Sequence, residues 1–190
     1  MTKYKEIRGI HIQSVATDPE VYAGTWASGG SLNQGRLGMM SSGGGTQTAG
    51  LVFGGYKNDS AAADETESYN GTSWTELANL NTARMAAGGC GATNTAALAF
   101  GGSIPPKSAA NEQWDGSSWT EVGDLNLARE GNQGTGTSTA ALTFGGEAGS
   151  PASRKGETES WNGSSWTEVG DLNTVRMRAG GAGTSTAALA

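Results

Sequence analysis

A segment of about 45 residues recurs along this chain, and the recurrence limits what the chain can fold into. Two short runs mark each copy, Ser-Trp-Thr-Glu and Phe-Gly-Gly. The marked positions are Trp74, Trp119, Trp166, Phe53, Phe100 and Phe144. Repeats of this length are typical of architectures in which each copy is one small unit that buries its apolar face against its neighbours. The chain is therefore predicted to be an array of similar units.

The connectors between copies are fixed in length and chemistry. An arginine follows the tryptophan of each Ser-Trp-Thr-Glu run by ten residues, and a Leu-Asn pair lies between the two. A weaker copy near the start keeps the same spacing, so that the connector positions are Trp26 with Arg36, Trp74 with Arg84, Trp119 with Arg129 and Trp166 with Arg176. The repeats are predicted to occupy residues 21–190, as units 36–80, 84–125 and 129–172 and a partial unit 176–190.

Each unit is predicted to supply about four β-strands. Runs such as Thr95–Phe100 are too short for a stable helix, and glycine-rich segments flank them. A hairpin follows, in which Asn70-Gly71 is predicted to form a two-residue turn. That turn places Tyr69 opposite Thr72, with Tyr69 and Trp74 on one face of the hairpin. The later copies carry the same aromatic pairs, Trp114 with Trp119 and Trp161 with Trp166.

These residues together resemble the kelch repeat. The shared pattern is a Gly-Gly doublet after a small apolar strand, a variable loop, an aromatic residue, a tryptophan and a connector to arginine, over roughly residues 21–190. The resemblance implies an all-β fold of four-stranded propeller blades around an axis. About three and a half repeats cannot close a ring, so we expect either a longer natural polypeptide or blades from neighbouring chains. The half-copy at Trp26 would suit ring closure.

Residues present in every repeat are expected to be structural. The glutamate two positions before each hairpin aromatic residue recurs, and it is expected to pair with the recurring arginine or to cap backbone groups between blades. These glutamates are Glu67, Glu112 and Glu159. An active site needs polar groups that break the repeat and converge. The only histidine, His11, lies outside the repeats, whereas kelch propellers that resemble galactose oxidase bind copper through paired histidines. No catalytic, cofactor-binding or metal-binding residue is assigned, and the chain is predicted not to be an enzyme.

Two loop glutamates, Glu65 and Glu157, leave an alternative open. Carboxylates in loops bind calcium in some proteins, but they are more often simply solvated. The only cysteine, Cys90, is expected to be a small buried thiol.

The overall charge limits the partners. The net charge is −6 and no Lys/Arg cluster is present, which argues against a nucleic-acid partner, since such proteins present a basic stripe. No segment approaches the length needed to span a bilayer, so no membrane insertion is expected. No cofactor is expected.

Residues 1–20 differ in composition from the repeats, and they are predicted to form a docking arm. Glycine-, serine- and threonine-rich kelch-like arrays behind an arm such as residues 3–15 resemble phage virion proteins, in particular tail fibres of marine phages. That resemblance implies a homo-oligomer in an extracellular particle, with the arm on other virion proteins. The loops after each Phe-Gly-Gly differ in length and charge, and they would bind a host-surface glycan or protein. The alternatives are a cellular kelch scaffold for protein–protein interaction and, less favoured, a propeller enzyme.

Overall fold

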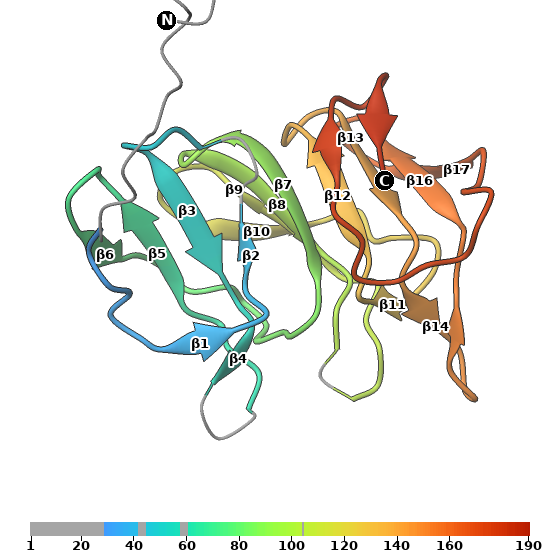
Figure 1. Ribbon diagram of the computed structural model, residues 1–190, viewed down its shortest axis with the longest axis horizontal. Coiled ribbons are helices and arrows are strands. Elements are labelled where there is room, and N and C mark those ends of the chain that lie inside the picture. The colour runs from blue at the N-terminus through green and yellow to red at the C-terminus, as the bar shows by residue number, and fades with distance from the viewer. Residues whose placement is uncertain (1–28, 42–44, 58–60, 104) are drawn as a thin grey trace, which may run out of the picture.

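The computed structural model describes residues 29–41, 45–57, 61–103 and 105–190, and strands joined by turns and loops make up all of this part (Figure 1). The expectation of an all-β fold is confirmed. The predicted arm, residues 1–20, and Trp26 lie outside the described residues. Within the described ranges, no helix is long and apolar enough to cross a membrane.

Three four-stranded antiparallel sheets carry most of the chain, one from each of the first three repeats. In each of them the strands pair in the order in which they follow along the chain. The first sheet holds β2 (Met40–Ser41), β3 (Gly50–Phe53), β5 (Thr66–Tyr69) and β6 (Trp74–Glu76). The second holds β7 (Gly88–Thr93), β8 (Ala96–Phe100), β9 (Asn111–Trp114) and β10 (Trp119–Val122). The third holds β12 (Gln133–Gly136), β13 (Ala141–Phe144), β16 (Thr158–Trp161) and β17 (Trp166–Val169).

Smaller sheets, which the sequence did not predict, organise the segments between these strands. In the first and third repeats, residues after the Gly-Gly doublet pair with the arginine segment of the same repeat. These sheets are β1 (Arg36–Leu37) with β4 (Tyr56–Lys57), and β11 (Arg129–Glu130) with β14 (Glu147–Ala148) and β15 (Ser153–Arg154). In the second repeat single bridges, from Ser103 to Met85 and to Lys107, take their place. A hairpin of β18 (Ala182–Gly183) and β19 (Ala188–Leu189) begins the fourth repeat.

The predicted two-residue turn at Asn70-Gly71 is wrong. Tyr69 pairs directly with Trp74, so the loop has four residues, although the two aromatic residues share a face as expected. The asparagine side chain explains the difference, because its Oδ1 accepts hydrogen bonds from the main-chain N–H groups of Thr72 and Ser73, each at 2.9 Å. An Asn side chain that mimics a backbone turn in this way favours the wider loop. Asp115 and Asn162 form the equivalent loops.

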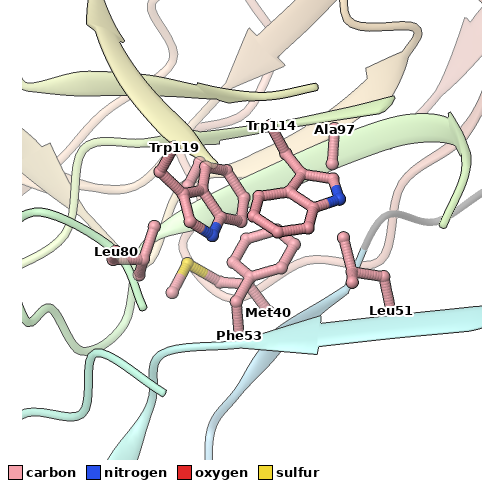
Figure 2. Close-up of a cluster of buried hydrophobic side chains, with 8 residues drawn as sticks. Met40, Leu51, Phe53, Leu80, Ala97, Trp114 and Trp119 are labelled. Atoms are coloured by element: carbon pink, nitrogen blue, oxygen red, sulfur yellow. The ribbon is translucent and has the colours of Figure 1, made fainter. Parts of the chain in front are cut away.

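The apolar cores lie between consecutive sheets. Between the first and second sheets, Met40, Leu51, Phe53 and Leu80 meet Ala97, Ala99, Trp114 and Trp119 (Figure 2). The ring of Phe53 meets that of Trp119 edge-on at a centroid distance of 4.8 Å. Phe100 and Trp166 repeat this contact between the second and third sheets, at 5.1 Å. Consecutive sheets therefore share their apolar cores.

Small residues make room for these rings. A Cβ atom on Gly134 would lie 2.3 Å from Cζ of Phe100, so the ring of one sheet rests on the bare backbone of the next. The same relation holds for Phe144 and Gly181. Cys90 joins the second core, where it is 2% exposed, and burial raises the pKa of its thiol to about 12. The expected buried thiol is thus confirmed.

The position of Phe100 makes a prediction about stability. Phe100→Ala is expected to lower the free energy of unfolding by about 3–5 kcal/mol, because it leaves a cavity between two sheets. Leu37→Ala, at a residue that is 64% exposed, is expected to change it by less than about 0.5 kcal/mol. Urea unfolding followed by tryptophan fluorescence measures both. Equal effects would contradict a core located between the sheets.

Candidate functional site

A buried ion pair joins the recurring arginine to the recurring glutamate in each of the first three repeats. Arg84 Nη2 lies 2.5 Å from Glu112 Oε1, and Arg129 Nη2 lies 2.7 Å from Glu159 Oε1. Arg36 and Glu67 form the third pair. The side chains of all six are at most 2% exposed. The pairing that the sequence suggested is therefore confirmed.

The connector ties each glutamate to the preceding sheet as well. Asn81 donates both its main-chain N–H and its Nδ2 to the Oε2 of Glu112, at 2.7 and 2.9 Å. One residue earlier, the N–H of Leu80 donates to the main-chain oxygen of Asp64, which leads into the first sheet. Asn126, Glu159 and Leu125 repeat this arrangement one sheet further on. Both oxygens of Glu112 and of Glu159 thus accept hydrogen bonds from the connector that arrives from the preceding sheet.

The environment of Glu67 favours its charged form. Burial, the largest influence, acts to raise the pKa of Glu67. Hydrogen bonds from the main chain of Asn33 and from the Arg36 guanidinium, together with the charge of that guanidinium, outweigh the burial. The pKa of Glu67 therefore lies below its ordinary value, and the carboxylate is ionised around neutral pH.

The recurring aromatic residues are internal packing groups in the second and third sheets. Trp119 donates its Nε1 to Thr66 Oγ1 of the first sheet at 2.9 Å, while Trp114 donates to the main-chain oxygen of Asn94 within its own sheet at 3.1 Å. Trp161 follows Trp114 in donating to the main-chain oxygen of Ser138. At the first sheet, Trp74 donates to the main-chain oxygen of Gly30.

The fourth recurring arginine, Arg176, differs from the other three. Its guanidinium is exposed and donates to the main-chain oxygens of Thr174 and Ala190, at 3.3 and 3.2 Å. Among the described residues it contacts no carboxylate. Arg176 is thus the exposed one of the four recurring arginines in the described residues.

The variable loops gather at one end of the sheets, the lower edge in Figure 1, where β1, β4, β11 and β14 lie. Their described residues are 56–57, 61–66, 103, 105–111 and 147–158. The ammonium group of Lys107, from the second loop, lies 3.3 Å from Glu147 and 3.7 Å from Glu130 of the third repeat. Ion pairs thus join the second loop to the third repeat.

A cavity of about 450 Å³ opens where the first segments of four consecutive repeats meet. The second residue after each recurring arginine lies on its rim in the left-handed conformation, with φ between 52° and 63°. These residues are Gly38, Ala86, Gly131 and Arg178. The N–H of Gly131 donates to the oxygen of Ala86, and the N–H of Arg178 donates to that of Gly131. Backbone hydrogen bonds between repeats therefore hold this wall of the cavity.

The walls of the cavity differ in chemistry. Leu37, Met39 and Tyr56 of the first repeat form an apolar side, whereas Gln133 and Arg178 lie on the side made by the third and fourth repeats. Arg178 is exposed, and its guanidinium has no ion-pair partner among the described residues. The sequence reasoning missed Arg178. Alignment of the repeats would have shown it, because it is the one charged residue at a position otherwise held by glycine or alanine.

The glutamates considered for calcium are paired with lysines instead. Glu65 lies 2.6 Å from Lys57, and Glu157 lies 3.4 Å from Lys155. Burial acts to raise the pKa of both glutamates, but hydrogen bonds and the neighbouring lysines leave each pKa below its ordinary value. In the part of the chain that the structure describes, no three His, Cys, Asp or Glu residues are grouped as metal ligands. His11 lies outside that part.

Comparison with known proteins gives no family for this chain. No protein-family model matches it, and no curated protein is significantly similar to it.

The buried pair of the second repeat makes a prediction. Arg84→Met leaves Glu112 charged and buried, so we expect a loss of about 3–5 kcal/mol in the free energy of unfolding. Lys155→Ala removes a partly exposed pair and is expected to cost less than about 1 kcal/mol. Chemical denaturation of both variants compares them. A similar small loss for both would show that the buried pair does not join the sheets.

Glu67 gives a prediction about pH. Its pKa in the folded protein is below the unfolded value of about 4.3, so its contribution to stability is present above that pH and is lost as the pH falls through the folded pKa. The difference in unfolding free energy between wild type and Glu67→Gln should therefore be largest at neutral pH and shrink below about pH 4. Urea titrations at several pH values measure it, with Glu76→Gln, at an exposed position of β6, as control. A difference that stays constant with pH would contradict this role.

Proposed function

We propose that the three sheets are consecutive blades of a kelch-like β-propeller. Several features support this. The sheets share one strand order, and each packs on the next through the same phenylalanine–tryptophan contact. Their first strands also lie side by side, since β7 contacts β2 on one side and β12 on the other. Strands in that relation are what blades around a common axis require.

We further propose that the chain is a binding and structural module of a phage particle, such as a tail fibre or another appendage. The observation that carries the proposal is the division between scaffold and loops. The recurring charged and aromatic residues of the first three repeats make contacts within and between sheets, whereas the variable loops lie together at one end, where an ion pair joins the second loop to the third. A fixed scaffold that displays variable loops is a common way to present a binding surface.

In this proposal residues 1–20 dock on other virion proteins, and the loops contact a glycan or protein of the host surface. The chain acts as a homo-oligomer in an extracellular particle. It needs no nucleic acid, membrane insertion, metal or cofactor. The virion assignment is supported by the resemblance of the repeat composition to phage tail fibres.

A cellular kelch scaffold is the second candidate, because the same loop surface would serve a protein partner. An enzyme is the least favoured of the three candidates. In the described residues the recurring glutamates are bonded to arginine and asparagine, and the one charged group that lines the cavity is the guanidinium of Arg178.

The loop surface gives the test of this function. The fluorescently labelled protein is expected to bind host cells, and replacing residues 147–154 by a Gly/Ser segment of equal length should lower that binding at least tenfold. Thr137→Ala with Thr139→Ala, in the loop at the other end of β13, should leave it unchanged. Mass spectrometry of purified particles should detect the chain. Its absence from particles, together with binding to a cellular protein, would favour the scaffold instead.

A further inference from the structure

The cavity between the four repeats carries one charged side chain that has no ion-pair partner in the part of the chain that the structure describes. Arg178 is the charged residue of its lining. An unpaired guanidinium at a cavity of about 450 Å³ is suited to an anionic ligand, because its planar N–H groups match a carboxylate or phosphate. The size is within the range of small-molecule sites.

Arg178 adopts a conformation that its side chain disfavours. Its φ is 54°, in the left-handed region, where the equivalent residues of the first and third repeats are glycines. A Cβ atom on Gly131 would lie 3.4 Å from Cγ of Arg178, so the arginine stem passes close to bare backbone of the neighbouring repeat. Strained backbone at a residue that lines a cavity is a recurrent property of binding sites.

The part of the cavity wall that comes from the first repeat contains an aromatic ring. A Cβ atom on Gly38 would lie 3.2 Å from Cδ2 of Tyr56, so this ring lies beside the equivalent glycine of the first repeat. Leu37 and Met39 extend the apolar wall. Ser103 and Glu147 occupy the position of Tyr56 in the other repeats, so the aromatic wall is confined to this side.

We propose that the cavity binds a sugar residue that carries a carboxylate, such as a uronic acid of a surface glycan. Arg178 holds the carboxylate, Tyr56 with its apolar neighbours covers a C–H face of the ring, and Gln133 bonds a hydroxyl. A carboxylate is favoured over a phosphate because the backbone N–H groups that form many phosphate sites are occupied here: those of Gly131 and Arg178 bond the adjacent repeat. The proposal rests on the proposed host-surface function and names its ligand class.

The test compares three probes by NMR titration and calorimetry. Glucuronate is expected to bind wild type, glucose to bind at least tenfold more weakly, and glucose 6-phosphate to bind no better than glucose. Glucuronate binding no tighter than glucose binding would overturn the proposal. Glucose 6-phosphate binding as tight as that of glucuronate would overturn the carboxylate class.

The chain offers a matched variant for Arg178. Arg178→Gly introduces the residue found at positions 38 and 131, so it removes the guanidinium and relieves the positive φ without harming the fold. We expect at least a tenfold loss of glucuronate affinity with an unchanged or higher melting temperature. Arg176→Ala removes an exposed arginine of the same repeat that does not line the cavity, and it should bind glucuronate as wild type does. Equal binding by wild type and Arg178→Gly would overturn the role of Arg178.

The cell-binding experiment separates this inference from the proposed function. Cell binding that Arg178→Gly leaves intact, while the loop replacement abolishes it, would refute the sugar site and keep the attachment function. Glucuronate binding through Arg178 by a protein that binds no cell would keep the site and refute the function.

Discussion

The buried carboxylate of each repeat is the constraint on which the arrangement depends. A charged glutamate inside a protein is tolerated only if it is paired and its oxygens accept hydrogen bonds. In the second repeat Arg84 supplies the pair and Asn81 supplies the bonds, and both belong to the connector that arrives from the first sheet. A displaced connector would leave the charge uncompensated. The charge thus fixes where one sheet sits on the next.

The packing depends on the same order of sheets. Phe100 finds its aromatic partner, Trp166, and its bare backbone, Gly134, in the sheet that follows. Each phenylalanine thus depends on the next sheet for part of its burial, as expected for repeat proteins. This arrangement also explains how a chain poor in large aliphatic residues forms a core. Strands of alanine and glycine let neighbouring sheets approach closely, while a few large aromatic rings provide the buried apolar area.

The features that the sequence predicted are those that repeat. The held spacing of Arg84 and Glu112 predicted a structural pair, and the alternation of short apolar runs with Gly-Gly predicted the strands. The length of the hairpin loop was predicted wrongly, because the side chain of Asn70 competes with the backbone for hydrogen bonds. The small sheets at β4 and β14 were not predicted, because their pairing depends on tertiary contacts rather than on a local sequence pattern. Arg178 was not predicted, because the prediction relied on residues that the repeats share, and Arg178 differs from the glycine or alanine at its repeat position.

The four-residue hairpin loops accept either asparagine or aspartate. Each uses Oδ1 as the acceptor of two N–H groups, an atom that both side chains possess. The remaining contact reverses: in the first loop Asn70 Nδ2 donates to Ser73 Oγ, whereas in the second Ser118 Oγ donates to Asp115 Oδ2. A serine hydroxyl can do both. Asn70→Asp and Asn162→Asp would therefore keep the acceptor that closes each loop, so the two residue types are interchangeable at this position of the repeat.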